Sequence, residues 1–327
     1  MPSIAIFGGS GFIGLNIVES LLSSGYEVIN ISRHPSPDYA KYLFSKNKCY
    51  REELCDITST QTVENVLKKT LPDIIIQSCA ITPRDSEEIS ELSKTIEVNC
   101  LSTLKLVELS KKYGVKHFIY LGSVAVYGDS CQECATIPEC TKIFNPISVY
   151  DYSKYITDRL LYRYKRLTGY NITILRLGDA FGPWERFTES RHVLSAPTQV
   201  LKLLSKGENV FLPKEGKTGW IYSRDVGTAI VLLIKSKPQH SIYHLSNNTT
   251  WSIYDFACYI SKMYPGTKVS IDPNKSNVSF FSEKDNGIFL MDNFLHDYGY
   301  NCKYGMRDAA NDFIAWYKSI DRENLFI

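Results

Sequence analysis

Two side chains that can move a proton stand four residues apart in the middle of the chain. Tyr150 and Lys154 fall one turn apart in a predicted helix, so both point from the same face. A free tyrosine has a pKa of about 10, and a nearby ammonium stabilises the phenolate and lowers that pKa. The spacing therefore predicts that Tyr150 exchanges a proton near neutral pH. Ser123 follows a predicted strand, which places its hydroxyl at the carboxyl edge of a sheet, where open α/β folds bind ligands.

A glycine-rich loop near the start of the chain predicts a dinucleotide cofactor. It lies between a predicted strand, Ile4–Phe7, and a predicted helix, Phe12–Leu22. Gly8 permits a tight turn, Gly11 lets the backbone approach a pyrophosphate, and Gly14 lets the helix pack closely on the sheet. The free N–H groups and the positive dipole end of that helix favour phosphate.

The end of the second predicted strand, Tyr26–Ile31, indicates which cofactor is preferred. An acidic residue there would hold the 2′-hydroxyl of NAD. This chain has Ser32 followed by Arg33, and a guanidinium attracts the 2′-phosphate of NADP. We therefore predict NADP as the preferred cofactor and NAD as the alternative. The other interpretation of Arg33 is a solvated surface arginine without a role in binding. Asp56 is placed to hydrogen-bond the adenine, with Ile57 beside it.

A parallel sheet has to position these groups, and the sequence alternates strand and helix patterns as such a sheet requires. Further strands are predicted at Asp73–Gln77, His117–Leu121 and Ile172–Leu177, and helices at Thr60–Lys69, Val98–Lys112 and Lys154–Arg166. This succession predicts an α/β fold, a Rossmann-type doubly wound sheet over residues 1–182. Beyond it the pattern is less regular, and we predict a smaller C-terminal α/β lobe for the substrate over residues 183–327. Its predicted helices are Pro197–Lys206, Val226–Ser236, Ser252–Met263 and Met306–Ser319.

Bulk properties exclude several classes of protein. The chain has 327 residues, 44% of them hydrophobic and 22% charged, with a net charge of +2, which gives no basic footprint for nucleic acid. No apolar run approaches the roughly 18 residues of a membrane span, and the first residues do not resemble a signal peptide. We therefore expect a cytoplasmic protein without nucleic-acid or membrane partners. Cys131, Cys134 and Cys140 lack a fourth ligand at suitable spacing, so no metal site is predicted.

Taken in order, the motifs resemble those of the extended short-chain dehydrogenase/reductase family, which includes nucleotide-sugar epimerases, dehydratases and reductases. Besides the glycine loop, Asp56, Ser123 and the Tyr150/Lys154 pair, the matching motifs are Gln77-Ser78-Cys79-Ala80, Val98-Asn99, Val126-Tyr127-Gly128, Arg176-x5-Gly182-Pro183, Trp220–Val226 and Tyr243–Ser246.

The resemblance implies a role for each matching residue. Tyr150 would be the general acid/base, Ser123 would hydrogen-bond the reacting oxygen, and Lys154 would tune Tyr150 and hold the nicotinamide ribose. Asn99 would support the active-site backbone. The implied catalytic residues are Ser123, Tyr150, Lys154 and Asn99. The predicted cofactor contacts are Gly8, Ser10, Gly11, Phe12, Ile13, Gly14, Ser32, Arg33, Asp56, Ile57, Cys79, Ala80, Asn99, Tyr150, Lys154 and Leu177. The resemblance also implies a homodimer through helices Val98–Lys112 and Lys154–Arg166.

Two positions depart from the pattern of nucleotide-sugar members near the expected diphosphate. Asp179 stands where those members carry Asn, and a carboxylate repels a diphosphate unless it is protonated or paired. Thr218 stands where they tend to carry Arg. After Gly182-Pro183, Trp184 could stack on a ring, and Arg186 and Arg191 could clamp an anionic substrate; an exposed charged loop is the alternative. The predicted substrate contacts are Thr82, Ser123, Val124, Asp179, Trp184, Arg186, Arg191 and Trp220.

These observations predict an enzyme that transfers hydride between nicotinamide C4 and a carbonyl or carbinol carbon of a sugar-like substrate. The leading prediction is a nucleotide-sugar epimerase or a 4-keto-reductase. The alternative is an NADP-dependent reductase or dehydrogenase of a non-nucleotide polar substrate such as a sugar acid. Dehydration is disfavoured because Val124 and Ala125 follow Ser123 where a 4,6-dehydratase has an acid/base pair. A cofactor-binding regulator without turnover is the remote alternative, and the intact Ser123, Tyr150 and Lys154 argue against it.

Overall fold

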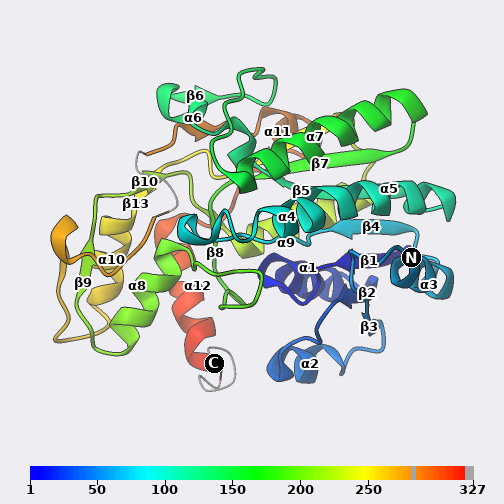
Figure 1. Cartoon of the computed structure of the whole chain (residues 1–327). Helices are drawn as coiled ribbons and strands as arrows, with labels where there is room; N and C mark the ends of the chain where they lie inside the picture. Colours follow the sequence, from blue (N-terminus) through cyan, green and yellow to red (C-terminus); the bar gives the residue numbers. More distant parts are fainter. Residues whose placement is uncertain (281–284, 321–327) are drawn as a thin grey trace.

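A seven-stranded parallel sheet forms the centre of the protein (Figure 1). The computed structural model describes residues 1–280 and 285–320. The strand order is β12-β7-β5-β4-β1-β2-β3, with the crossover between β1 and β4 expected of a doubly wound sheet. The strands are β1 (Ser3–Phe7), β2 (Glu27–Ser32), β3 (Tyr50–Leu54), β4 (Ile74–Gln77), β5 (His117–Ser123), β7 (Ile172–Leu177) and β12 (Ile242–Leu245). The predicted α/β Rossmann-type fold is confirmed.

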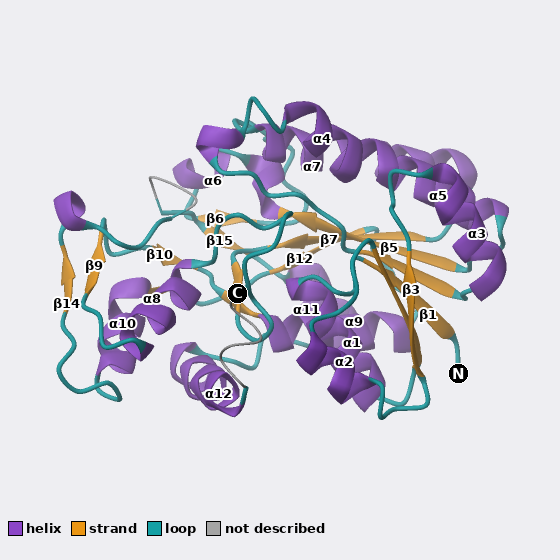
Figure 2. Ribbon diagram, turned by 60° about the horizontal axis from the view of Figure 1, so that its bottom comes forward, coloured by secondary structure: helices purple, strands orange, loops and turns teal. Residues whose placement is uncertain are grey.

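Helices cover both faces of the sheet (Figure 2). One face carries α3 (Thr60–Thr70), α5 (Ser102–Lys112) and α7 (Val149–Thr168), and the other carries α1 (Phe12–Ser23), α2 (Asp38–Phe44) and α9 (Ser223–Lys235). Because helices exclude water from both sides, β1 and β4 are apolar almost throughout instead of alternating.

Local signals fix the ends of the long helix that carries the predicted catalytic pair. The Ser148 side chain accepts a hydrogen bond from the Asp151 N–H at 3.0 Å, and the Asp151 carboxylate accepts from the Ser148 N–H at 3.3 Å, which is a capping box. Gly169 ends α7 in the left-handed conformation, with a φ of 67°. The first turn of α7 is therefore held firmly, and Tyr150 and Lys154 lie in its first two turns.

The part of the chain after residue 182 forms the smaller lobe and also contributes two elements to the Rossmann part. Its smaller lobe contains α8 (Ala196–Ser205), α10 (Ile253–Ser261), α12 (Met306–Ser319) and the strand pair β9 (Val210–Leu212) and β14 (Val269–Ile271). However, α9 packs on α1 and β12 pairs with β7, so both belong to the Rossmann part. The predicted lobe of residues 183–327 is thus interrupted by segments that return to the sheet, and its last residues, 321–327, lie outside the described residues.

The remaining elements are short. The helices are α4 (Leu92–Ile96), α6 (Ser130–Glu133) and α11 (Asp292–Tyr298). The strand pairs are β6 (Thr136–Ile137) with β15 (Ile288–Phe289), β8 (Ala180–Phe181) with β11 (Ile221–Tyr222), and β10 (Lys217–Thr218) with β13 (Trp251–Ser252). Within residues 1–280 and 285–320, none of the helices combines the length and the apolar character that a membrane span requires.

Candidate active site

Ser123, Tyr150 and Lys154 meet where β5 ends against the start of α7. Ser123 is the last residue of β5, and its Oγ accepts a hydrogen bond from the Ala125 N–H at 3.1 Å. The side chain of Ser123 acts on the Tyr150 phenol and lowers its pKa, so the two groups lie close together. The Lys154 ammonium lies 5.7 Å from the centre of the Tyr150 ring. The three residues that the sequence singled out are therefore brought together at the carboxyl edge of the sheet.

Lys154 is a buried cation with little electrostatic compensation. Its Nζ donates to the backbone carbonyl of Leu121 at 3.1 Å and lies 5.2 Å from the centre of the Tyr120 ring. Burial lowers the pKa of Lys154 to about 8, with the nearby Cys79 thiol acting in the opposite direction. At neutral pH the side chain is therefore still mostly protonated, and it is held in one place.

The expected lowering of the Tyr150 pKa is not found in this structure. Burial raises the pKa of Tyr150 to about 12, although the Ser123 side chain and the positive charge of Arg191 oppose that rise. The charges of Asp151 and Asp179 raise it further. An ammonium one helical turn away lowers the pKa of a phenol, but the loss of water around Tyr150 raises it, and desolvation is the larger effect here.

Asn99 connects two segments that flank the site. It lies in a π-helical turn, Glu97–Leu101, a distortion that often occurs at functional positions. Its Oδ1 accepts from the Ile81 N–H at 2.7 Å, and its Nδ2 donates to the Ile81 carbonyl at 3.0 Å and to the Ser153 hydroxyl at 3.0 Å. Asn99 thus ties the segment after β4 to α7, as expected of a residue that supports the active-site backbone.

The glycine loop lies at the carboxyl end of β1, directly before α1. Gly8 has a φ of +83°, in the left-handed region, and a Cβ on Gly14 would lie 2.2 Å from the Gly8 carbonyl oxygen. A side chain at either position would therefore push the loop out of shape. Cys79 lies directly beside Gly8, since a Cβ on Gly8 would meet the Cys79 nitrogen at 2.7 Å. Cys79 also acts on the pKa of Lys154, so the loop and the catalytic group lie on either side of Cys79.

Polar side chains surround the ends of β2 and β3, where the sequence predicts the adenosine of the cofactor. The Ser10 N–H donates to the Ser32 hydroxyl at 2.9 Å, which joins the glycine loop to the end of β2. Arg33 is half exposed and pairs with Glu189 at 2.7 Å. Asp56 accepts from the N–H and the hydroxyl of Thr58 at 2.9 and 2.8 Å. Arg33 therefore lies at the predicted place but already has a carboxylate partner.

Residues 185–195, which we call the strap, contact both the glycine loop and the segment after β4. The Thr82 N–H donates to the Ser190 carbonyl at 2.9 Å, and Arg84 Nε donates to the His192 carbonyl at 3.2 Å. At the other side Arg186 Nη2 donates to the Ser10 carbonyl at 2.7 Å. The strap thus joins the glycine loop to the segment after β4.

Three predicted substrate contacts, Trp184, Arg186 and Trp220, have other partners in the structure. Trp184 has no exposed surface and packs against aromatic rings of α2 and α12, while its indole N–H donates to Glu19 at 3.0 Å. It cannot stack on a ligand because both ring faces are covered by the core. Arg186 lies against the glycine loop, where it donates to the Ser10 carbonyl. Trp220 is also buried, against Phe181 and Trp251.

Arg191 is held by a buried carboxylate that the sequence did not reveal. Glu185, 1% exposed, accepts from Arg191 Nε at 3.1 Å, from the Ser195 N–H at 2.7 Å and from the Thr198 hydroxyl. Arg191 also lies over the Phe12 ring, 5.0 Å from its centre. Because Arg191 acts on the pKa of Tyr150, Glu185 places a cation close to the catalytic phenol. A lone Glu in a charged loop carries no local signal for that role.

Asp179 and Thr218, the two residues that depart from the family pattern at the expected diphosphate position, contact each other. The Thr218 hydroxyl donates to the Asp179 carboxylate at 3.3 Å. Burial raises the pKa of Asp179, while Thr218, Lys214 and Asn286 counteract that rise. The carboxylate is therefore paired, and a cation from Lys214 lies in its surroundings. Of the other predicted substrate contacts, Val124 is buried behind Ser123.

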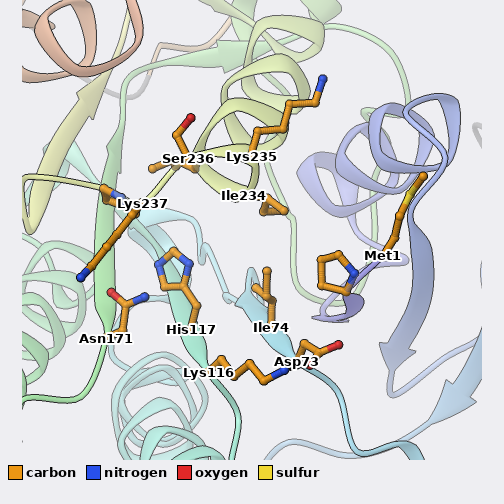
Figure 3. A pocket seen from close by; sticks show the side chains of 13 residues that line it. Met1, Asp73, Ile74, Lys116, His117, Asn171, Ile234, Lys235, Ser236 and Lys237 are labelled. Atoms are coloured by element: carbon orange, nitrogen blue, oxygen red, sulfur yellow. Dashed lines mark hydrogen bonds and ion pairs between the residues drawn. The ribbon is translucent and has the colours of Figure 1, made fainter.

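The opposite edge of the sheet carries a separate pocket of about 560 Å³ (Figure 3). Its lining includes Asp73, His117 and Asn171, which stand just before or at the start of their strands, together with Lys235 at the end of α9 and Lys237 after it. Parallel strands all end at the other edge, so this pocket is remote from the catalytic group.

In the described part of the chain, the compact group of potential metal ligands is not the cysteine cluster but His240, His296 and Asp297. Both imidazoles are hydrogen-bonded to the Asp297 carboxylate, at 3.0 and 2.8 Å. Those hydrogen bonds account for the arrangement.

The family profile described as the NAD dependent epimerase/dehydratase family matches residues 4–246, three quarters of the chain. The protein belongs to this family. It is accordingly an enzyme of the extended short-chain dehydrogenase/reductase type, and the predicted resemblance is confirmed.

Relatives and solved structures agree with this assignment. A Methanocaldococcus jannaschii protein, provisionally named a UDP-glucose 4-epimerase, is 29% identical over 182 residues, which are 55% of this chain and 56% of that protein. The chain thus spans little more than half of that relative. A UDP-glucose 4-epimerase from Thermotoga maritima, solved with UDP-glucose, shares the fold with a TM-score of 0.79, 22% identity and coverage of 97% and 99% of the two chains. A dTDP-glucose 4,6-dehydratase from Bacillus anthracis, solved with NAD, has a TM-score of 0.81, 18% identity and 98% coverage of both.

Proposed function

We propose that this protein is a nucleotide-sugar epimerase that uses a nicotinamide cofactor, with a 4-keto-reductase as the closest variant. The observation that carries this proposal is the convergence of Ser123, Tyr150 and Lys154 at the sheet edge that also carries the glycine loop. Support comes from the names of its relatives, among them UDP-glucose 4-epimerases.

The side chains of the site fit reversible oxidation of a sugar hydroxyl. When bound, the nicotinamide ring supplies the acceptor for hydride from the carbinol carbon. Tyr150 Oη would take the hydroxyl proton and return it, and Ser123 Oγ would hydrogen-bond the same oxygen as it becomes a carbonyl. To act as a base Tyr150 must first ionise, which burial opposes and the cation Arg191 favours. Lys154 adds a second buried cation near the phenol.

The experiment is interconversion of UDP-glucose and UDP-galactose by the wild-type protein and two variants of the same helix. Tyr150→Phe should reduce turnover by about 10²- to 10⁴-fold, the usual size of general acid/base catalysis. Tyr152→Phe is the matched control, since that phenol is half exposed two residues away. Equal turnover of wild type and Tyr150→Phe would show that Tyr150 is not the acid/base.

A non-nucleotide polar substrate is the second candidate, favoured by the contact between Asp179 and Thr218. A diphosphate would meet a carboxylate there instead of an amide and a guanidinium. In a thermal-shift comparison, sugar acids should then stabilise the protein while UDP does not. Stabilisation by UDP alone would favour the nucleotide sugar, and Asp179→Asn should strengthen that effect.

We further propose that NADP is preferred over NAD. Family membership and the NAD-bound neighbour support a nicotinamide cofactor in general; the preference rests on Arg33 and on the lack of an acidic residue at the end of β2. Arg33 would have to exchange Glu189 for the 2′-phosphate. Arg33→Ala should weaken NADPH binding selectively, and Glu189→Gln should strengthen it. Equal losses for NADPH and NADH in Arg33→Ala would refute the preference.

A homodimer through α7 is also proposed. Tyr152, Ile156 and Leu160 recur every four residues on α7 and are 48%, 38% and 44% exposed, and Leu101 before α5 is 54% exposed. A contiguous apolar stripe of this kind favours coverage by a second copy. The double variant Ile156→Glu/Leu160→Glu should sediment as a monomer if the wild type is a dimer through this face.

All nine cysteines are free thiols, which suits the reducing cytoplasm where we place the protein.

A further inference from the structure

Arg186 is a largely buried cation without a counter-charge. Its guanidinium donates to two backbone carbonyls, Ser10 at 2.7 Å and Trp184 at 3.4 Å. Among the residues that the structure describes, no carboxylate lies within ion-pair distance of it. Burial lowers the pKa of Arg186 to about 10, which expresses the cost of holding that charge away from water.

Arg33 and Arg191, the other two arginines near the glycine loop and the strap, differ from Arg186 because each has a carboxylate partner. Arg33 pairs with Glu189, and Arg191 pairs with the buried Glu185. Arg33 is also half exposed, so water already screens its charge. Of these three arginines, Arg186 is therefore the one for which the described residues supply no carboxylate partner.

The surroundings of Arg186 add to its uncompensated positive charge. Ser10, which Arg186 contacts, stands two residues before α1, and Gly11 caps that helix without a side-chain hydrogen bond. The N–H groups of the first turn give the start of a helix a partial positive charge. The Arg186 guanidinium therefore places a second positive charge beside the start of α1. The carbonyls of Ser10 and Trp184 account for two of its five N–H donors, which leaves three for another acceptor.

We propose that Arg186 binds the pyrophosphate of the dinucleotide cofactor. The glycine loop offers backbone N–H groups to one side of the phosphates, and Arg186 would offer charged donors from the strap that crosses above the loop. This inference rests on the proposed function in one respect, namely that the protein binds NAD or NADP at the glycine loop. It also gives the strap a role, because the strap would hold Arg186 against the phosphates.

A purely structural role is the alternative to be separated. The bond to the Ser10 carbonyl could serve only to tie the strap to the loop, which a neutral amide could also do. Arg84 provides a matched control, since it too joins the strap to a neighbouring segment through an arginine–carbonyl bond, at 3.2 Å to His192, but it is exposed.

The experiment measures binding by calorimetry to the full-length protein after removal of bound nucleotide. The ligands are NAD, NADP, ADP-ribose and adenosine; the proteins are wild type, Arg186→Gln, Arg186→Lys and Arg84→Gln. A charged hydrogen bond of ordinary strength predicts that Arg186→Gln weakens NAD, NADP and ADP-ribose about 10- to 100-fold and leaves adenosine within about twofold. Arg186→Lys should recover part of the loss, and Arg84→Gln should resemble wild type. The salt dependence of ADP-ribose binding should also become shallower in Arg186→Gln.

Three results would overturn the inference. Equal weakening of adenosine and ADP-ribose means that Arg186 only supports the loop. A loss confined to NADP assigns Arg186 to the 2′-phosphate. Unchanged binding in both Arg186 variants means that the phosphates lie elsewhere. If the wild-type protein itself binds neither NAD, NADP nor ADP-ribose, the proposed function fails and this inference with it, which is distinguishable from the three results above.

Discussion

Replacing Lys154 by methionine should stabilise the protein while it abolishes turnover. The side chain is 3% exposed, and burial lowers its pKa from 10.5 to about 8. A difference of that size between the unfolded and the folded state corresponds to about 3 kcal/mol of lost stability at neutral pH. Methionine removes the charge, keeps most of the volume and gives up one hydrogen bond, to Leu121, worth about 1 kcal/mol. The net expected gain is about 2 kcal/mol.

The pH dependence distinguishes this cause from general repacking. As the pH falls from 10.5 toward 8, the unfolded chain takes up a proton on Lys154 that the folded chain does not, so the wild-type protein loses about 1.4 kcal/mol per pH unit. Below pH 8 both states carry the proton and the penalty is constant. The advantage of Lys154→Met should therefore be full at pH 7, begin to shrink above pH 8, and be gone by about pH 10.

Urea unfolding of the nucleotide-free proteins, followed by circular dichroism at pH 7, 8, 9 and 10, tests this reasoning. Lys48→Met is the control, because Lys48 is exposed and its replacement should shift stability little at any of these pH values. An advantage of Lys154→Met that stays constant from pH 7 to 10 would refute the electrostatic account. A variant that is less stable than wild type at pH 7 would do the same, because the buried ammonium would then be stabilising.

The remaining predictions concern the glycine loop and the strap. Gly14→Ala should weaken cofactor binding at least about tenfold in calorimetry, because its Cβ would lie 2.2 Å from the Gly8 carbonyl; Gly305→Ala, where the nearest atom would be 3.9 Å away, should bind like wild type. Glu185→Gln should lower the free energy of unfolding by about 3 kcal/mol, because it removes one member of a buried ion pair with Arg191. A change below about 1 kcal/mol in urea unfolding would mean that the strap does not depend on that charge.

Features with a local signal could be predicted from the sequence. The glycine loop, the strands on either side of the cofactor cleft and the Tyr150/Lys154 spacing each depend on residues close together in the chain, and the structure brings Ser123, Tyr150 and Lys154 into one site. Two strands of the sheet were not predicted. β3 is an edge strand with charged residues, Tyr50–Leu54, and therefore lacks the apolar run of a buried strand. β12 joins the sheet from beyond residue 182, where the alternating pattern had ended.

Only the tertiary structure decided what the charged and aromatic residues after Gly182-Pro183 do. Trp184 looked like a ligand-stacking ring, but residues of α2 and α12, far away in the sequence, cover it. Arg186 and Arg191 stand five residues apart in one loop. Arg186 lies against the glycine loop without a carboxylate partner, whereas Arg191 is neutralised by Glu185. The pKa of Tyr150 likewise depends on how much water the whole fold removes. Spacing along a chain determines which face a side chain shares with its neighbours, whereas burial and charge compensation depend on partners that folding brings from elsewhere.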